Sequence, residues 1–157
     1  MPKITRLDEV SVFGGRLAFL IPHEWVEVDD GEENTFLYQY PNADSGWFRV
    51  SLNTLETKRD PATRIKEIYS RGKGYSLHRK TGNRVLSYDK DTENEGTPLH
   101  IYFWLVANVV RPDRIHQAIF SYTILRERIG DQGNRDVINV LNQIVPQAKF
   151  QHGSAIA

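Results

Sequence analysis

The longest apolar pattern in the chain covers residues 99–125, as two runs of strand-forming residues around a short polar break. β-Branched and aromatic side chains are typical of packed strands. Pro112, inside the break at residues 111–113, cannot continue a sheet ladder. The segment therefore predicts a long β-hairpin. Both faces of its first arm, residues 99–110, are largely apolar, so we expect this arm to be central and covered on both sides.

Shorter runs before the hairpin predict further strands, because each is rich in apolar or aromatic residues and ends near Gly, Pro or a polar cluster. The polar segment 89–97, which carries five acidic or amide side chains, predicts a mobile loop before the hairpin. The expected strands are residues 9–13, 16–21, 34–40, 47–55, 75–79 and 84–88.

Two segments have helical spacing. Asp60 can cap a helix that starts with Pro61. Asn134 can cap a second helix, which Pro146 ends. Since two amphipathic helices each need a sheet face, the pattern favours an α+β fold, with a largely antiparallel β-sheet flanked by helices in an α/β/α sandwich. The apolar stripes are Ile65, Ile68 and Tyr69 in the first helix and Val137, Ile138, Leu141, Ile144 and Val145 in the second.

Composition narrows the class of protein. The 157 residues fit one domain, residues 1–150, followed by a disordered C-terminal tail, residues 151–157. The formal net charge is +0, which gives no indication of a nucleic-acid or membrane partner. There is no cysteine, so thiol catalysis, thiolate metal sites and disulfides are excluded. The N-terminus lacks the apolar segment of a secretory signal, and we expect a cytoplasmic protein.

No common catalytic or metal motif is present. The five histidines lack the spacing of a zinc-binding helix, and no serine lies in a nucleophile elbow. The acidic segment 89–95 lacks the Gly and Glu positions of a calcium loop, so a solvated loop is the better interpretation. We therefore expect no catalytic residue, no metal and no cofactor.

A locally basic stretch admits two interpretations. It can be a nucleic-acid surface with Tyr75 as a stacking ring, or a charged helix exit and edge strand. The neutral net charge favours the charged edge, and hence no nucleic-acid partner. The basic residues are Arg71, Lys73, Arg79, Lys80 and Arg84.

Aromatic residues around the first loops also admit two interpretations. Tryptophan and tyrosine are common anchors of protein interfaces, and they are equally common in cores. The candidate interface residues are Trp25, Tyr38, Tyr40, Trp47 and Phe48.

The opening VFGGRLAFLIPHEW resembles the entry hairpin of the PsbP-like superfamily, and the closing VINVLNQIVPQAKF is similar to its last helix. That superfamily includes PsbP, the Ran-binding Mog protein and DcrB-type lipoproteins. The resemblance implies an α/β/α sandwich and a role in binding rather than catalysis. It assigns no functional residue. The matching positions are Phe13, Gly15, Phe19, Ile21, Pro22 and Trp25.

The resemblance and the missing catalytic motifs together predict a non-catalytic, cytoplasmic, bacterial protein that binds another protein, as an adaptor or an effector-associated chaperone. A homodimer is a further form of partnership. The alternative is a small enzyme or ligand-binding protein with an unrecognised pocket. A deep pocket lined by converging polar groups distinguishes the alternative from the binding module.

Overall fold

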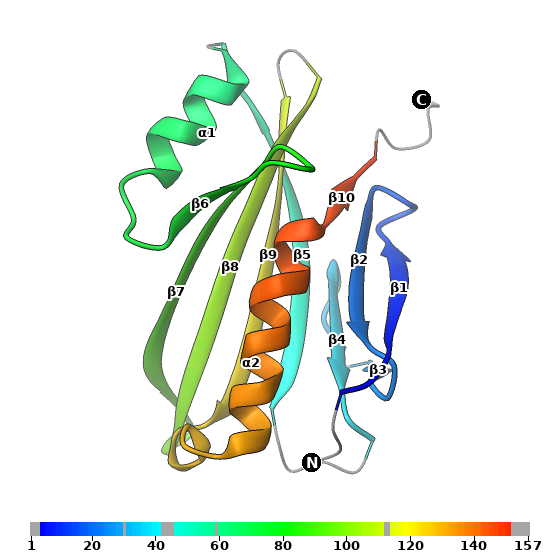
Figure 1. Ribbon diagram of the computed structural model, residues 1–157, viewed down its shortest axis with the longest axis vertical. Coiled ribbons are helices and arrows are strands. Elements are labelled where there is room, and N and C mark those ends of the chain that lie inside the picture. Colours follow the sequence, from blue (N-terminus) through cyan, green and yellow to red (C-terminus); the bar gives the residue numbers. More distant parts are fainter. Residues whose placement is uncertain (1–3, 30, 42–45, 59, 112–113, 152–157) are drawn as a thin grey trace.

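The computed structural model describes residues 4–29, 31–41, 46–58, 60–111 and 114–151. Its strands form two antiparallel sheets, and both helices pack on the larger one (Figure 1). In chain order the elements are β1 (Leu7–Val12), β2 (Leu17–Pro22), β3 (Val26–Val28), β4 (Thr35–Gln39), β5 (Trp47–Glu56), α1 (Pro61–Tyr69), β6 (Tyr75–His78), β7 (Asn83–Asn94), β8 (Thr97–Arg111), β9 (Arg114–Leu125), the 3-10 turn η1 (Arg126–Arg128), α2 (Gln132–Ile144), the 3-10 turn η2 (Val145–Gln147) and β10 (Lys149–Phe150).

The predicted hairpin is the centre of the larger sheet. Its two arms are β8 and β9, which pair from Leu99 opposite Leu125 to Arg111 opposite Arg114. The strand order is β3-β4-β5-β9-β8-β7-β6, so neither arm lies at an edge. Pro112 and Asp113 of the predicted turn lie outside the described residues. The fold is α+β with a mostly antiparallel sheet, as predicted.

The prediction of a mobile loop at residues 89–97 is wrong for most of that segment. Strand β7 continues to Asn94, and only Glu95 and Gly96 make the turn into β8. The polar side chains did not prevent pairing, because the first half of β8 supplies a complete ladder, from Lys90 opposite Ile101 to Asn94 opposite Thr97.

A second, three-stranded sheet of order β1-β2-β10 was not predicted. The predicted first hairpin forms β1 and β2, but β2 also pairs with β10, Phe150 lying opposite Leu17. Of the predicted tail, only Gln151 lies within the described residues, and its N–H donates to the Arg16 carbonyl oxygen over 2.9 Å.

The first helix begins as its sequence predicts. The Asp60 carboxylate accepts hydrogen bonds from the backbone N–H and the hydroxyl of Thr63, at 3.1 and 2.7 Å, and Pro61 is the first helical residue. The prediction that Asn134 caps the second helix is wrong. That helix begins three residues earlier, with Asp131 at the N-cap, and the buried Asn134 amide donates to the Arg128 carbonyl oxygen.

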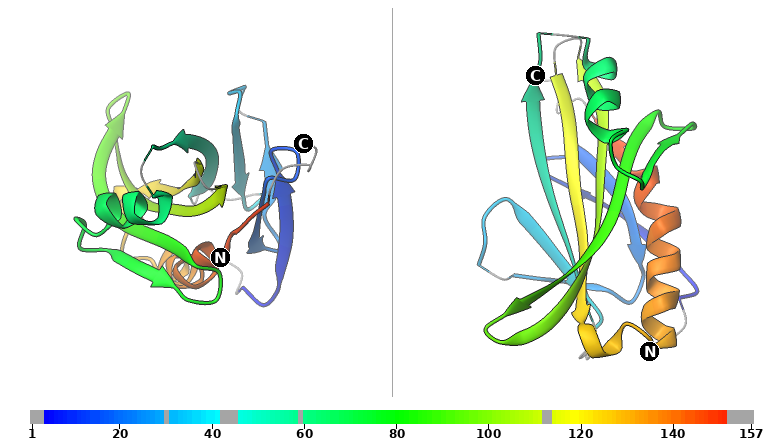
Figure 2. Two further views of the ribbon diagram at one scale, coloured as in Figure 1. Left: turned by 90° about the horizontal axis from the view of Figure 1, so that it is seen from above. Right: turned by 90° about the vertical axis from the view of Figure 1, so that its left-hand side faces the viewer.

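The two helices contact opposite faces of the central hairpin. Side chains alternate between the two faces of a strand, so neighbouring positions of β8 and β9 belong to different cores. Trp104 and Phe120 lie in the main core, which α2 and the small sheet cover. Ala107 and Ile115 lie in a second core, which α1 covers with Ile65. Figure 2 shows α1 at one end of the large sheet, with the strands extending well beyond it.

Candidate protein-binding surface

Helix α1 is too short to cover its face of the sheet. Its nine residues make a helix of about 14 Å, at 1.5 Å per residue. The fifteen residues of β8 extend over about 50 Å, at 3.4 Å per residue. The helix packs near Ala107 and Ile115, at one end of the hairpin. The rest of that face is therefore left without a helix.

Cross-strand pairs form two rows on this uncovered part. In one row Tyr88 lies opposite Phe103, which lies opposite Ser121. In the other, Lys90 lies opposite Ile101. Residues directly opposite each other in a sheet have neighbouring side chains. We call the following set the open face: Trp47, Tyr88, Lys90, Ile101, Phe103, Ile119 and Ser121.

The open face is apolar and partly exposed. Tyr88 is 45% exposed, and its ring stacks on Phe103, with centroids 4.9 Å apart and planes at 18°. The Lys90 ammonium lies 5.4 Å from the centre of the Phe103 ring. Ile101, Phe103 and Ile119 are only half-buried, and among the described residues they belong to neither core. A contiguous patch of this kind is typical of a protein interaction site.

A charged pair borders the apolar rows. Arg49 lies opposite Ser121 in the sheet, and its guanidinium meets the Glu32 carboxylate at 2.6 Å. An apolar centre with a polar edge is the usual anatomy of an interface.

Four of the five predicted interface aromatics lie in the core. Trp25, Tyr38, Tyr40 and Phe48 are at most 5% exposed. Trp25 stacks on Tyr122, with ring centroids 5.9 Å apart. These four rings therefore contribute almost no exposed area to a protein interface on the described surface. Trp47 is half-buried and lies on the open face, and its contact with a partner stays a prediction.

The basic stretch is divided between the segment after α1, with Arg71 and Lys73, the turn after the edge strand β6, with Arg79 and Lys80, and β7, with Arg84. The Arg84 guanidinium donates a hydrogen bond to the Tyr75 hydroxyl. Tyr75 packs against the second core, so its ring is not presented as a stacking surface. The arrangement fits a charged sheet edge.

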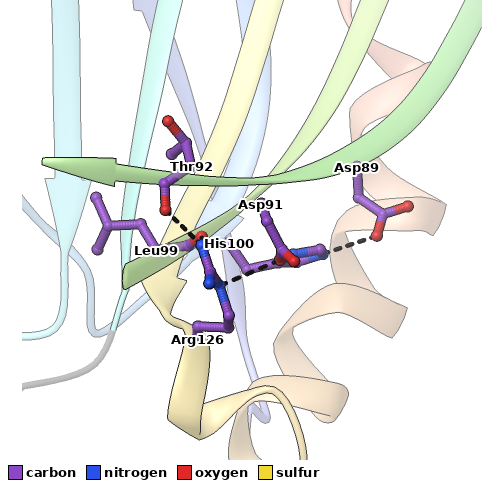
Figure 3. A network of polar contacts seen from close by, with 6 residues as sticks. All are labelled: Asp89, Asp91, Thr92, Leu99, His100 and Arg126. Atoms are coloured by element: carbon purple, nitrogen blue, oxygen red, sulfur yellow. Dashed lines mark hydrogen bonds and ion pairs between the residues drawn. The ribbon is translucent and has the colours of Figure 1, made fainter. Parts of the chain in front are cut away.

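A polar network, which the sequence did not indicate, fastens the far end of β7 and β8. The imidazole of His100 lies between two carboxylates: Nδ1 is 2.7 Å from Asp91 and Nε2 is 2.7 Å from Asp89 (Figure 3). Arg126 extends the network, donating to the Thr92 carbonyl oxygen at 2.7 Å, with its Nε 3.4 Å from Asp91. The network ties η1 to the strands.

This network is suited to holding β7, β8 and η1 together. Only the doubly protonated imidazolium can donate to both carboxylates, since a neutral imidazole has one N–H. Among the described residues, no group of three His, Asp or Glu side chains is arranged to hold a metal ion.

Replacing Asp91 with asparagine is expected to lower stability at pH 7. The hydrogen bond from His100 holds the pKa of the Asp91 carboxyl below its ordinary value of 3.8. A carboxyl with a lowered folded-state pKa stabilises the fold above the ordinary value, and this contribution is lost as pH falls through the lowered pKa. Urea midpoints of wild type and Asp91→Asn should therefore differ at pH 7 and converge below pH 3.8. A difference that stays constant with pH contradicts this origin.

Comparison with known proteins places the fold. No family model and no curated protein matches the sequence. Among solved structures, a protein from Bacteroides thetaiotaomicron matches with a TM-score of 0.59 and 17% identity, covering 91% of this chain; the chain spans 48% of that protein. The Saccharomyces cerevisiae Ran-binding protein Mog1p matches with a TM-score of 0.52 and 12% identity, covering 92% of this chain and 95% of Mog1p. LpqN, involved in cell envelope biogenesis of Mycobacterium tuberculosis, matches with a TM-score of 0.57 and 11% identity. The match covers 93% of this chain and 91% of LpqN.

The chain thus has a Mog1/PsbP-like fold, and the resemblance drawn from the opening and closing motifs is confirmed at the level of the fold. At these identities the likeness carries no residue-level role. Among the described residues, no helix combines the length and the apolar character that crossing a membrane requires.

Proposed function

We propose that this chain is a non-catalytic protein-binding module whose partner docks on the open face. The observation that carries the proposal is the row of Tyr88 and Phe103, with Ile101 beside it: aromatic and aliphatic side chains half out of water and outside both cores. Aromatic residues at the centre of a patch are the usual anchors of an interface. The partner should present apolar side chains, because the patch has one cation, Lys90, over mostly apolar surface.

Known proteins of this fold support the general role. Mog1p is a Ran-binding protein, and a fold of the same kind therefore serves protein binding elsewhere. We extend the proposal to a cytoplasmic bacterial adaptor or effector-associated chaperone, without enzymatic activity. The proposal includes the α/β/α sandwich implied by the family resemblance, with α1 as one outer layer and α2 with the small sheet as the other.

The test compares how much partner protein is retained by the wild type and by a variant of the open face. The tagged wild type is passed through lysate of its native cells beside a double variant, Ile101→Thr/Phe103→Thr, and retained proteins are quantified by mass spectrometry. Threonine keeps the strand propensity and removes the apolar area. We expect one retained protein to fall by about tenfold or more on the double variant, as for the truncation of central anchors.

Leu77→Thr is the matched control, because Leu77 is 43% exposed on the edge strand β6, away from the open face. It should retain the partner at the wild-type level. Equal retention by the double variant contradicts the proposal. Light scattering identifies the case in which the occupant is a second copy, since the wild type is then a dimer and the double variant a monomer.

A further inference from the structure

A pocket of about 650 Å³ lies where the small sheet meets β3 and β4. Its residues come from β1, from the turn after β1, from β2, from Trp25 just before β3, and from the β3–β4 hairpin. Phe13 and Phe36 join the two sheets at this point, their rings edge to face with centroids 5.0 Å apart. A volume of this size matches sites for small organic ligands, which range over about 300–1,000 Å³.

Aromatic rings form much of the wall. Trp25 and Tyr38 are 5% and 3% exposed, and the core around them fixes their rings. Tyr38 is edge to face with Phe19, with centroids 5.9 Å apart. Rings held by packing present a prearranged surface, which reduces the entropy that a ligand loses on binding.

Among the described residues, the charged groups that line the pocket are both acidic, Asp8 and Glu27. The described part of the lining includes no Lys, Arg or His. The Tyr38 hydroxyl donates to Glu27 over 3.5 Å, which orients that carboxylate. Asp8 has one oxygen 2.7 Å from the His23 ring. Both carboxylates are accessible, since Glu27 is exposed and the Asp8 side chain is 41% exposed.

We propose that this pocket binds a small organic cation, an ammonium or guanidinium group on an apolar stem. Two carboxylates attract the cationic group and repel an anion. The apolar stem lies against Phe13 and Phe36. The same group can belong to a free amine or to an arginine side chain of a peptide.

The pocket is independent of the open face. Phe36 and Tyr38 lie opposite Val50 and Phe48, which belong to the main core, on the side of the sheet away from α1. An experiment can therefore contradict ligand binding in this pocket without contradicting protein docking on the open face, and the reverse.

The experiment is a titration of the full chain by nuclear magnetic resonance, with four probes. Butylguanidinium and the blocked amino acid N-acetylarginine methylamide represent the free and the peptide source. Butylurea is the neutral counterpart, and valerate the anionic one. We expect saturable shifts at the Trp25 indole N–H and at backbone amides of β1 and β4 with both cations, and at least tenfold weaker binding of butylurea and valerate. The cation that binds more tightly identifies the source.

Charge removal inside and outside the pocket completes the test. Glu27→Gln should weaken cation binding about fivefold or more, and Asp8→Asn/Glu27→Gln should abolish it. Glu9→Gln is the matched control, because Glu9 lies beside Asp8 in β1 but meets Lys149 at 3.3 Å instead of lining the pocket. Its affinity should stay within twofold of wild type. Equal binding of butylurea, or unchanged affinity in the double variant with its spectrum intact, overturns the proposal.

Discussion

Replacing Phe120 with alanine is expected to lower the free energy of unfolding by about 3–5 kcal/mol. Phe120 has no exposed surface and lies in β9, the strand at the centre of the larger sheet. Its ring stacks on Phe48 at 5.7 Å and meets Phe19 edge to face at 5.4 Å. Alanine leaves a cavity between the two sheets, because these rings belong to different strands and cannot all move inward.

Denaturation in urea, followed by circular dichroism, measures this loss. Ser121→Ala is the control, since Ser121 is the next residue of the same strand but faces the open side. Its effect should stay within about 0.5 kcal/mol. The proposed packing is contradicted if Phe120→Ala costs no more than this control.

The second large effect is expected at Asn83, a polar residue with no exposed surface. Its amide donates to the carbonyl oxygens of Pro146 and Ala148, at 2.9 and 2.7 Å, and its own oxygen accepts from Asn108 at 2.8 Å. Alanine leaves these carbonyls unpaired. At about 1–3 kcal/mol for each of the two carbonyl groups, the expected loss is about 2–6 kcal/mol.

Asn53→Ala serves as the comparison, because Asn53 is exposed in β5. It should change the unfolding free energy by less than about 0.5 kcal/mol. Hydrogen exchange adds a local readout for Asn83→Ala: amides of η2 and β10 should exchange faster than those of β9. Uniformly unchanged exchange rates would argue against an anchoring role of Asn83.

The sequence predicted those structural features that depend only on residues close together in the chain. Asp60 and Pro61 mark the start of α1 by themselves, and the two arms of the central hairpin have the composition of strands. Asn83 shows the limit. Beside Gly82 it has the pattern of an ordinary turn residue, and nothing in the nearby sequence shows that two of its partners, Pro146 and Ala148, lie more than sixty positions later.

The open face was missed for a similar reason. Both faces of β8 are apolar, which predicted cover on both sides. The sequence also contained the evidence against full cover, since the helix after Asp60 is too short for such a strand. The pocket needed the tertiary structure, because Asp8 and Glu27 meet only when β1 packs beside β3 and β4. Likewise, the acidic segment before Thr97 became strand only through its partner.

The pairing of β2 with β10 determines when the chain can finish folding during synthesis. A ribosome releases β2 before β9, α2 and β10, yet Leu17 and Phe19 of β2 pack in the main core against β9 and α2, and Leu17 pairs with Phe150. These apolar side chains stay exposed until the segment up to residue 150 has emerged, because their partners lie far along the chain. Until then the first hairpin is accessible to chaperones and proteases.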